Sequence, residues 1–178
     1  MTIGQKPHEY SSIQRIDINK KPAVLPSDIV VRDMFGNKIN LLQTFSGKSK
    51  VTFFSFFAEW CPNCHYEASQ IKKMFYDNKT FRIDMVLVMD YSTRKNSLDF
   101  VDKYQLKMPL FFGELPEKND EKRNNTQFYK FRKSFGDERA WGMPFHIIID
   151  QKTPGKFGIV TGEIIEKEIL QYFSKMHL

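Results

Sequence analysis

Three mostly apolar runs of the chain predict strands that are buried on both faces. They are Lys50–Phe57, Arg82–Met89 and Phe145–Ile149. Runs of this kind are typical of the central strands of a sheet that helices cover on both sides. A small hairpin is predicted by Ile29–Val31 and Lys38–Leu41 around the turn Asp33–Asn37. Met108–Phe112 predicts a short strand or a turn around Pro109, and Phe157–Val160 predicts a hairpin partner for Phe145–Ile149.

Apolar side chains recur at helical spacing in four other segments. The first helix begins at Pro62, a residue that suits the first helical position, and its periodic residues are Cys64, Ala68, Ile71 and Phe75. The second runs from about Lys95 to Tyr104, and the third begins at Phe128. The last, Glu163–Met176, is expected to turn inward Ile164, Ile165, Ile169, Leu170 and Phe173.

The alternation of strands and helices predicts an α/β fold with a central mixed β-sheet flanked by helices. We expect one domain over residues 22–178, preceded by a flexible lead-in over residues 1–21. The most polar stretch, residues 114–127, predicts a surface insertion that either docks a partner or is a solvated loop. With 178 residues, 41% of them hydrophobic, the chain is long enough for one domain with an ordinary core.

The net charge of +6 does not mark a nucleic-acid-binding protein. Lys and Arg are spread along the chain among Asp and Glu, which indicates a solvated surface, or loose attraction to anionic partners or a membrane surface. No apolar stretch is long enough to span a bilayer, and Met1–Lys21 lacks the apolar core of a secretory signal. Either a native cytosolic start or a start left after removal of a signal or anchor fits this pattern.

The two cysteines of the chain both lie in the segment Trp60–Cys64. A Cys-x-x-Cys pair between a buried strand and a helix is the layout of a dithiol redox site. The helix start favours an anion, so we expect Cys61 to be the nucleophilic thiolate. Cys64 lies one turn further in and is expected to resolve the mixed disulfide. Trp60 is expected to cover one side of the site.

A cysteine pair can also bind a metal ion, which requires further ligands, or it can be chemically inert. A structural zinc site would need two further ligands, and His8, His65, His146 and His177 show no paired spacing. Copper handling would use Cys61, Cys64 and a nearby His or Met as soft ligands. We favour redox chemistry and expect no cofactor and no bound metal.

The segment Phe57–Cys64 resembles the active-site segment of the thioredoxin superfamily. A second match is Gly142-Met143-Pro144 before the strand Phe145–Ile149. This resemblance implies a thioredoxin-like fold in which Pro144 is a cis-proline that packs against the cysteines and presents backbone to the substrate. Trp60 and Pro144 are expected to contact the substrate, and Met143 beside Pro144 either forms part of the substrate groove or simply packs.

A third match resembles the TlpA-like branch, which includes membrane-tethered reductases that serve cytochrome c maturation. It comprises Pro22-Ala23, Ile29–Val31, Gly36–Ile39 and Gly47-Lys48, the counterpart of an N-terminal β-hairpin. The resemblance implies protein thiols or disulfides as substrates, and an electron donor in the membrane or of thioredoxin type. It further implies a monomer in an extracytoplasmic location, such as the bacterial periplasm, although a cytoplasmic location is compatible with the sequence.

Two positions place the chain nearer to TlpA-like reductases than to thioredoxin itself. Thioredoxin has a buried Asp six residues before its first cysteine, where this chain has Ser55. TlpA-like reductases have a Glu six residues after that cysteine, and here it is Glu67, which is either a proton carrier for Cys64 or an exposed helix glutamate. Some cytochrome-maturation members have a Glu after the cis-proline, where this chain has Phe145 and then His146. His65 either tunes the thiolate or is a surface histidine.

The sequence therefore predicts a thiol–disulfide oxidoreductase that uses a Cys-Pro-Asn-Cys pair, more often as a reductase. A disulfide-forming oxidase would use the same residues. A copper-handling binding module of the same fold is the alternative from another functional class. The direction depends on the reduction potential of Cys61 and Cys64, which Pro62 and Asn63 influence but do not fix.

Overall fold

The central sheet has the strand order β2-β9-β8-β5-β6-β7-β3-β4 in our computed structural model, which describes residues 7–19, 25–45, 49–77 and 82–176. Strands β5, β6 and β7 are parallel, and the other pairs of this sheet are antiparallel. The strands are β2 (Gln14–Asp17), β3 (Val30–Arg32), β4 (Lys38–Asn40), β5 (Val51–Phe57), β6 (Ile83–Met89), β7 (Leu110–Gly113), β8 (Phe145–Asp150) and β9 (Lys156–Val160). A separate parallel pair joins β1 (Tyr10–Ser11) to β10 (Glu163–Ile164).

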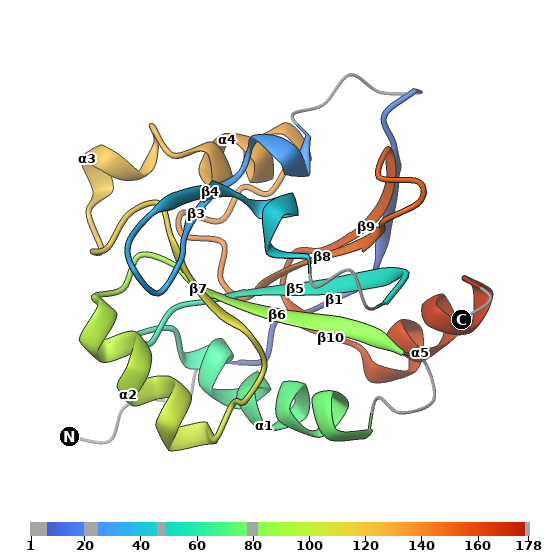
Figure 1. Ribbon diagram of the computed structural model, residues 1–178, viewed down its shortest axis with the longest axis horizontal. Helices are drawn as coiled ribbons and strands as arrows, with labels where there is room; N and C mark the ends of the chain where they lie inside the picture. The colour runs from blue at the N-terminus through green and yellow to red at the C-terminus, as the bar shows by residue number, and fades with distance from the viewer. Residues whose placement is uncertain (1–6, 20–24, 46–48, 78–81, 177–178) are drawn as a thin grey trace.

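Five α-helices are assigned within the described residues, and they form layers on the two sides of the sheet. In Figure 1, α1 and α2 lie below the sheet with α5 at its right end, and α3 and α4 lie above it. The helices are α1 (Pro62–Asp77), α2 (Arg94–Tyr104), α3 (Asp120–Arg123), α4 (Gln127–Ser134) and α5 (Glu166–Lys175). Two 3-10 turns, Pro26–Asp28 and Leu41–Thr44, flank the β3–β4 hairpin.

Strand β5 is buried along its whole length because its alternate side chains meet a different helical layer on each face. On one face, Phe53 packs edge-on against Phe173 of α5, with 6.2 Å between ring centroids. On the other face, Phe56 stacks on Phe128 of α4 at 4.2 Å. Ser55 shares the face of Phe53, so a polar side chain lies within the aromatic core on the α1 side.

The predicted strands, the β3–β4 hairpin and the helices that begin at Pro62, near Lys95 and near Phe128 are confirmed. The segment 7–19 differs from the flexible lead-in that the sequence predicts. Its strand β2 extends the sheet beside β9, and β1 pairs with β10. Alternation is too short in these segments to mark strands, and their partners are more than 130 residues away in the chain.

The C-terminal helix begins later than predicted. Glu163 and Ile164 form strand β10, and Ile165 immediately precedes α5. Leu170, expected to face inward, is 41% exposed, while Ile169 and Phe173 are buried. The backbone leaves the helical path here because β10 pairs with β1, and because the Ile164 N–H donates to the carboxylate of Glu67 over 2.6 Å.

Several of the expectations concern residues outside the described part of the chain. These are residues 1–6, 20–21, the Pro22-Ala23 and Gly47-Lys48 segments, and His177. Within the described ranges, none of the helices combines the length and the apolar character that crossing a membrane requires.

Candidate functional site: a dithiol at the start of α1

Cys61 lies beyond the carboxyl end of β5, immediately before α1, and lines a cleft of about 190 Å³. The side chain is only 4% exposed, so a partner reaches its sulfur through this cleft. The cleft is lined by Glu9, Trp60, Cys61, Pro62, Asn63, Arg139, Ala140, Trp141, Gly142 and Met143. Three segments therefore build it: the N-terminal strand region, the cysteine motif, and the loop before β8.

The pKa values of the two cysteines are shifted in opposite directions. The thiol of Cys64 hydrogen-bonds to Cys61, and this bond is the main reason why the pKa of Cys61 is lowered. Burial opposes that change, and the N–H of Cys64, 3.3 Å from the Cys61 sulfur, assists it. The pKa of Cys64 is raised well above its ordinary value, first by complete burial and then by Cys61. Cys61 is the side chain that can act as a thiolate while Cys64 holds its proton.

The Met143–Pro144 peptide bond is cis, as the resemblance predicts. Met143 is 6% exposed and lines the cleft beside Cys61. Trp60 also lines the cleft; its indole N–H donates to the carbonyl of Tyr91 over 2.9 Å, and its ring packs edge-on against Trp141. The three candidates for substrate contact therefore lie in or next to one cleft.

Glu67 lies in the interior, 1% exposed, on the turn of α1 that follows Cys64. One carboxylate oxygen accepts the N–H of Ile164, and the other is 3.0 Å from Nε2 of His146. The negative charge of Glu67 contributes to the raised pKa of Cys64, after the larger effects of burial and of Cys61. Glu67 is thus coupled to the resolving cysteine electrostatically.

His146 is a site residue that sequence reasoning did not assign. It is fully buried on β8, two residues after Pro144, and its Nδ1 is 3.1 Å from the hydroxyl of Ser55. Ser55, His146 and Glu67 therefore form a continuous buried chain of hydrogen bonds behind the cysteines. The sequence did contain a signal for this contact: a serine and a histidine each lie within an apolar strand, and a buried polar side chain needs a polar partner.

Asn63, the second residue between the cysteines, is also buried and bound in a way that the motif did not indicate. Its amide donates to the carboxylate of Glu163 over 2.8 Å and to the carbonyl of Pro7 over 3.1 Å. Glu163 also accepts the Glu9 N–H and is 2.7 Å from Nδ1 of His8. The N-terminal segment is thereby fixed beside the cleft.

His65 is turned away from the cysteines. Its Nε2–H donates to the carbonyl of Glu59 over 2.6 Å, and its Nδ1 accepts from the hydroxyl of Tyr104 over 2.7 Å. Burial lowers the pKa of His65, which fits a neutral ring with this pattern of one donor and one acceptor. His65 is thus a half-buried helix histidine that binds Glu59 and Tyr104, and none of these contacts reaches the cysteines, as a residue that tunes the thiolate would require.

The polar segment 114–127 is mostly exposed to solvent, and two of its cations contact the aromatic side chains of the site. It contains α3, and the ammonium group of Lys118 lies 4.0 Å from the ring centroid of Trp60. Arg123 lies over Trp141 at 4.5 Å. Cation–π contacts therefore hold this insertion on the aromatic wall of the cleft.

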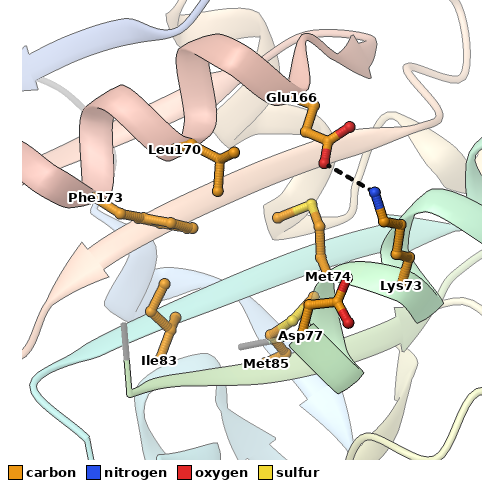
Figure 2. Close-up of a pocket in the computed structure, with 8 residues that line it drawn as sticks. All are labelled: Lys73, Met74, Asp77, Ile83, Met85, Glu166, Leu170 and Phe173. Carbon is orange, nitrogen blue, oxygen red and sulfur yellow. Dashed lines mark ion pairs between the residues drawn. The ribbon is translucent and has the colours of Figure 1, made fainter. Parts of the chain in front are cut away.

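A second hollow, of about 170 Å³, lies between the end of α1, β6 and α5, away from the cysteines (Figure 2). Its lining is mostly apolar, and the Lys73–Glu166 ion pair, 3.5 Å long, crosses its rim. None of the cysteine-site residues lines it. Across the described residues, no three side chains from His, Cys, Asp and Glu converge as a set of metal ligands.

The fold and the site together define a thioredoxin-like protein with a Cys-x-x-Cys dithiol at the start of its first long helix. Residues 23–153 match the AhpC/TSA family, and the chain belongs to that family. The chain has no match among curated proteins.

Solved structures with the same fold include several proteins described as thiol–disulfide oxidoreductases. The thioredoxin-related protein from Neisseria meningitidis serogroup B is 24% identical, with a TM-score of 0.59 over 83% of this chain and 98% of that one. The DsbF homologue from Corynebacterium diphtheriae is 15% identical, with a TM-score of 0.59 over 98% and 96%. The secreted Mycobacterium tuberculosis disulfide oxidoreductase homologous to E. coli DsbE is 13% identical, with a TM-score of 0.56 over 84% and 97%. At these identities the likeness establishes the thioredoxin-like fold.

Proposed function

We propose that the protein is a thiol–disulfide oxidoreductase that reduces disulfides of other proteins. The observation that carries this proposal is that Cys61 lines the cleft with a lowered pKa, while Cys64, on the first turn of α1, is completely buried with a raised pKa. This arrangement provides one attacking thiolate and one reserve thiol, which are the two groups that stepwise reduction needs.

The reaction has two steps. The Cys61 thiolate attacks one sulfur of the substrate disulfide, forms a Cys61–substrate bond, and releases the other substrate sulfur as a thiolate that takes up a proton. Cys64 then loses its proton and attacks the Cys61 sulfur, which releases the second substrate thiolate. Two electrons pass from the protein dithiol to the substrate, and the Cys61–Cys64 disulfide that results is reset by a dithiol reductant.

Glu67 is proposed as the proton carrier for the second step. In the mixed disulfide Cys61 is no longer a thiolate, so burial and the Glu67 charge are what still hold the proton on Cys64. If Glu67 takes that proton, its own negative charge disappears as the Cys64 thiolate forms. The buried pair then keeps a single charge, which avoids the cost of two adjacent anions in a low-dielectric interior.

Trp60, Met143 and Pro144 are proposed to position the substrate over Cys61. Their support is their placement: Trp60 and Met143 line the cleft, and Pro144 follows Met143 in the loop that borders it. The natural substrates would be exposed disulfides that enter a narrow cleft. An extracytoplasmic location is proposed by analogy with the similar proteins described as secreted.

Replacement of Cys64 by Ala is expected to trap substrates on Cys61. Without the resolving thiol the first step still takes place, so disulfide-linked complexes should accumulate. Dithiothreitol should separate them by reducing the mixed disulfide. Non-reducing gel electrophoresis with reduced C64A and an oxidised protein substrate such as insulin measures this. The matched control is C61A, which keeps Cys64 but has no accessible nucleophile and should form no complex.

The same assays separate the reductase from its alternatives. A reduction potential for the Cys61–Cys64 pair near that of thioredoxin, about −270 mV, would support the reductase, and one near −120 mV would indicate a disulfide-forming oxidase. Tight, stoichiometric Cu(I) binding with no insulin reduction would favour copper handling instead. If C64A forms no mixed disulfide, the proposed mechanism is wrong.

A further inference from the structure

Three charged side chains form a cluster between α4 and the loop that ends at Pro144. They are Arg132 on α4, Asp137 and Arg139, with side chains 0%, 2% and 26% exposed respectively. Nη1 of Arg132 donates to Asp137 over 2.9 Å, and Arg139 binds both oxygens of the same carboxylate, each at 2.9 Å. Two guanidinium groups share one carboxylate, so the cluster carries one positive charge in excess.

The carboxylate of this cluster is ionised. Burial alone would raise the pKa of Asp137, but the hydrogen bonds and charges of Arg139 and Arg132 outweigh burial and lower it. Well-packed apolar residues can often replace a buried ion pair without loss of stability. Fold stability is therefore a weak explanation for two guanidinium groups at this place, and their contacts suggest another one.

The guanidinium of Arg139 holds the backbone of the loop that carries the cis-proline. It donates to the carbonyls of Gly142 and Pro144 over 3.2 Å and lies 3.5 Å from that of Met143. Arg132 donates to the carbonyls of Arg139 and Ala140 in the same loop, each over 3.3 Å. Gly142 has a φ of +65°, and a Cβ at this position would come within 1.9 Å of Nη1 of Arg132, so only glycine fits.

Arg139 also lines the cleft of Cys61. The titratable or charged groups that face Cys61 are Cys64 beneath it, Glu9 and Arg139 in the cleft lining, and Glu67 beyond Cys64. Of these groups, all within the described residues, Arg139 carries the positive charge, and the others are thiols or carboxylates. Its charge contributes to the lowered pKa of Cys61, after the larger effects of the Cys64 hydrogen bond, burial and the backbone N–H groups.

We propose that Arg139 is a positioning residue for thiol–disulfide exchange, which holds the Gly142–Pro144 loop in place for the substrate and sets a positive charge beside the Cys61 sulfur. The two roles use different properties of the side chain. Holding the loop needs the planar fork with several N–H donors, whereas favouring the thiolate needs only the charge. This inference deepens the proposed function and, for its substrate-related part, rests on it.

Arg139→Lys and Arg139→Met separate the two roles. We expect R139M to raise the pH midpoint of Cys61 alkylation by iodoacetamide by about half a pH unit or more, because a nearby cation is removed. R139K keeps the charge and should leave that midpoint near the wild-type value. Both variants lose hydrogen bonds to the loop, so both should raise KM for insulin reduction by about 3-fold to 10-fold. Near-UV circular dichroism of Trp60 and Trp141 checks that the fold is retained.

Lys133→Met is the matched control, because it removes the same charge from the surface of α4, where Lys133 lies 3.8 Å from Glu138. An alkylation midpoint of R139M equal to that of K133M would overturn the role of the charge. A KM of R139K equal to that of wild type would overturn the role in holding the loop. Alkylation needs no protein substrate, so its outcome remains informative even if wild-type protein fails to reduce insulin, a result that would count against the proposed function alone.

Discussion

Glu67→Gln is expected to slow the resolving step about 100-fold while leaving the attack by Cys61 nearly unchanged. The carboxylate is proposed to accept the proton of Cys64, and general-base contributions of this size are typical. An amide keeps the shape and can still accept the N–H of Ile164, which the structure places 2.6 Å from the carboxylate. Its NH₂ group would face Nε2 of His146, so the imidazole would carry its proton on Nδ1 and donate to Ser55. The fold is therefore expected to survive the change.

A coloured aryl disulfide measures the two steps separately in a stopped-flow experiment. The first equivalent of aryl thiolate reports attack by Cys61, and the second reports resolution by Cys64. Glu166→Gln is the control, because it makes the same change in a surface glutamate that pairs with Lys73 over 3.5 Å and does not line the cleft of Cys61. If the second phase of E67Q is as fast as that of E166Q, or faster, Glu67 acts on Cys64 only through its charge and the proton-carrier role fails.

Asp90→Asn is expected to make the fold more stable than wild type, and this gain should be larger at pH 8 than at pH 4. Asp90 is 1% exposed, and its Oδ1 accepts the N–H of Tyr91 over 2.8 Å. Among the described residues, its Oδ2 has no hydrogen-bond partner. Burial, and to a lesser degree the charge of Glu114, raises the pKa of Asp90 to about 7 against the opposing Tyr91 bond. The ionised form is thus disfavoured inside the protein.

The sign of the pH effect follows from this raised pKa. The native state binds a proton on Asp90 more tightly than the unfolded chain, whose carboxyl has a pKa near 4. The contribution to stability is complete below about pH 4, decreases as the pH rises, and is lost above about pH 7. One pKa unit corresponds to about 1.4 kcal/mol, so the loss is on the order of 4 kcal/mol. An asparagine does not ionise and avoids it.

Urea unfolding at pH 4, 6 and 8 tests this expectation through the difference between wild type and D90N. That difference should grow in favour of the variant as the pH rises. Asp137→Asn is a suitable contrast, because the pKa of Asp137 is lowered and the variant removes the shared partner of two arginines. D137N should lose stability at pH 8, on the order of 3 to 5 kcal/mol. A D90N curve parallel to wild type at all three pH values would show that Asp90 does not titrate in this window.

Residues close in sequence account for most of what could be predicted about the fold. Apolar runs identified β5, β6 and β8 because a strand covered on both faces has no polar alternation to obscure it. Helical spacing after Pro62 identified α1, because the side chains that face the sheet recur every three or four residues. The β1 and β2 strands and the start of α5 could not be predicted, because each depends on pairing with a segment far away in the chain.

For the site, too, local sequence features were predictable and long-range contacts were not. The redox pair follows from Cys61 and Cys64 being one helical turn apart at a helix start, and the sequence alone was sufficient for it. Glu67 was expected near Cys64, but its burial and its partner His146, 79 residues away, were not predictable from helical spacing. Arg139 gave no motif signal, since its contacts to the loop are to backbone carbonyl groups, which carry no sequence signature, and its ion pair with the nearby Asp137 looks like an ordinary surface pair in the sequence.

The sequence by itself determined that this is an α/β protein with a Cys-x-x-Cys dithiol, because strand burial, helix starts and cysteine spacing are local properties of the chain. Only the tertiary structure decided how that dithiol is tuned. The Ser55–His146–Glu67 chain, the Arg132–Asp137–Arg139 cluster and the link from Asn63 through Glu163 to the N-terminal segment each exist because folding brings polar groups into an interior where they must find partners. Those partners are selected by the packing of the sheet and its helices.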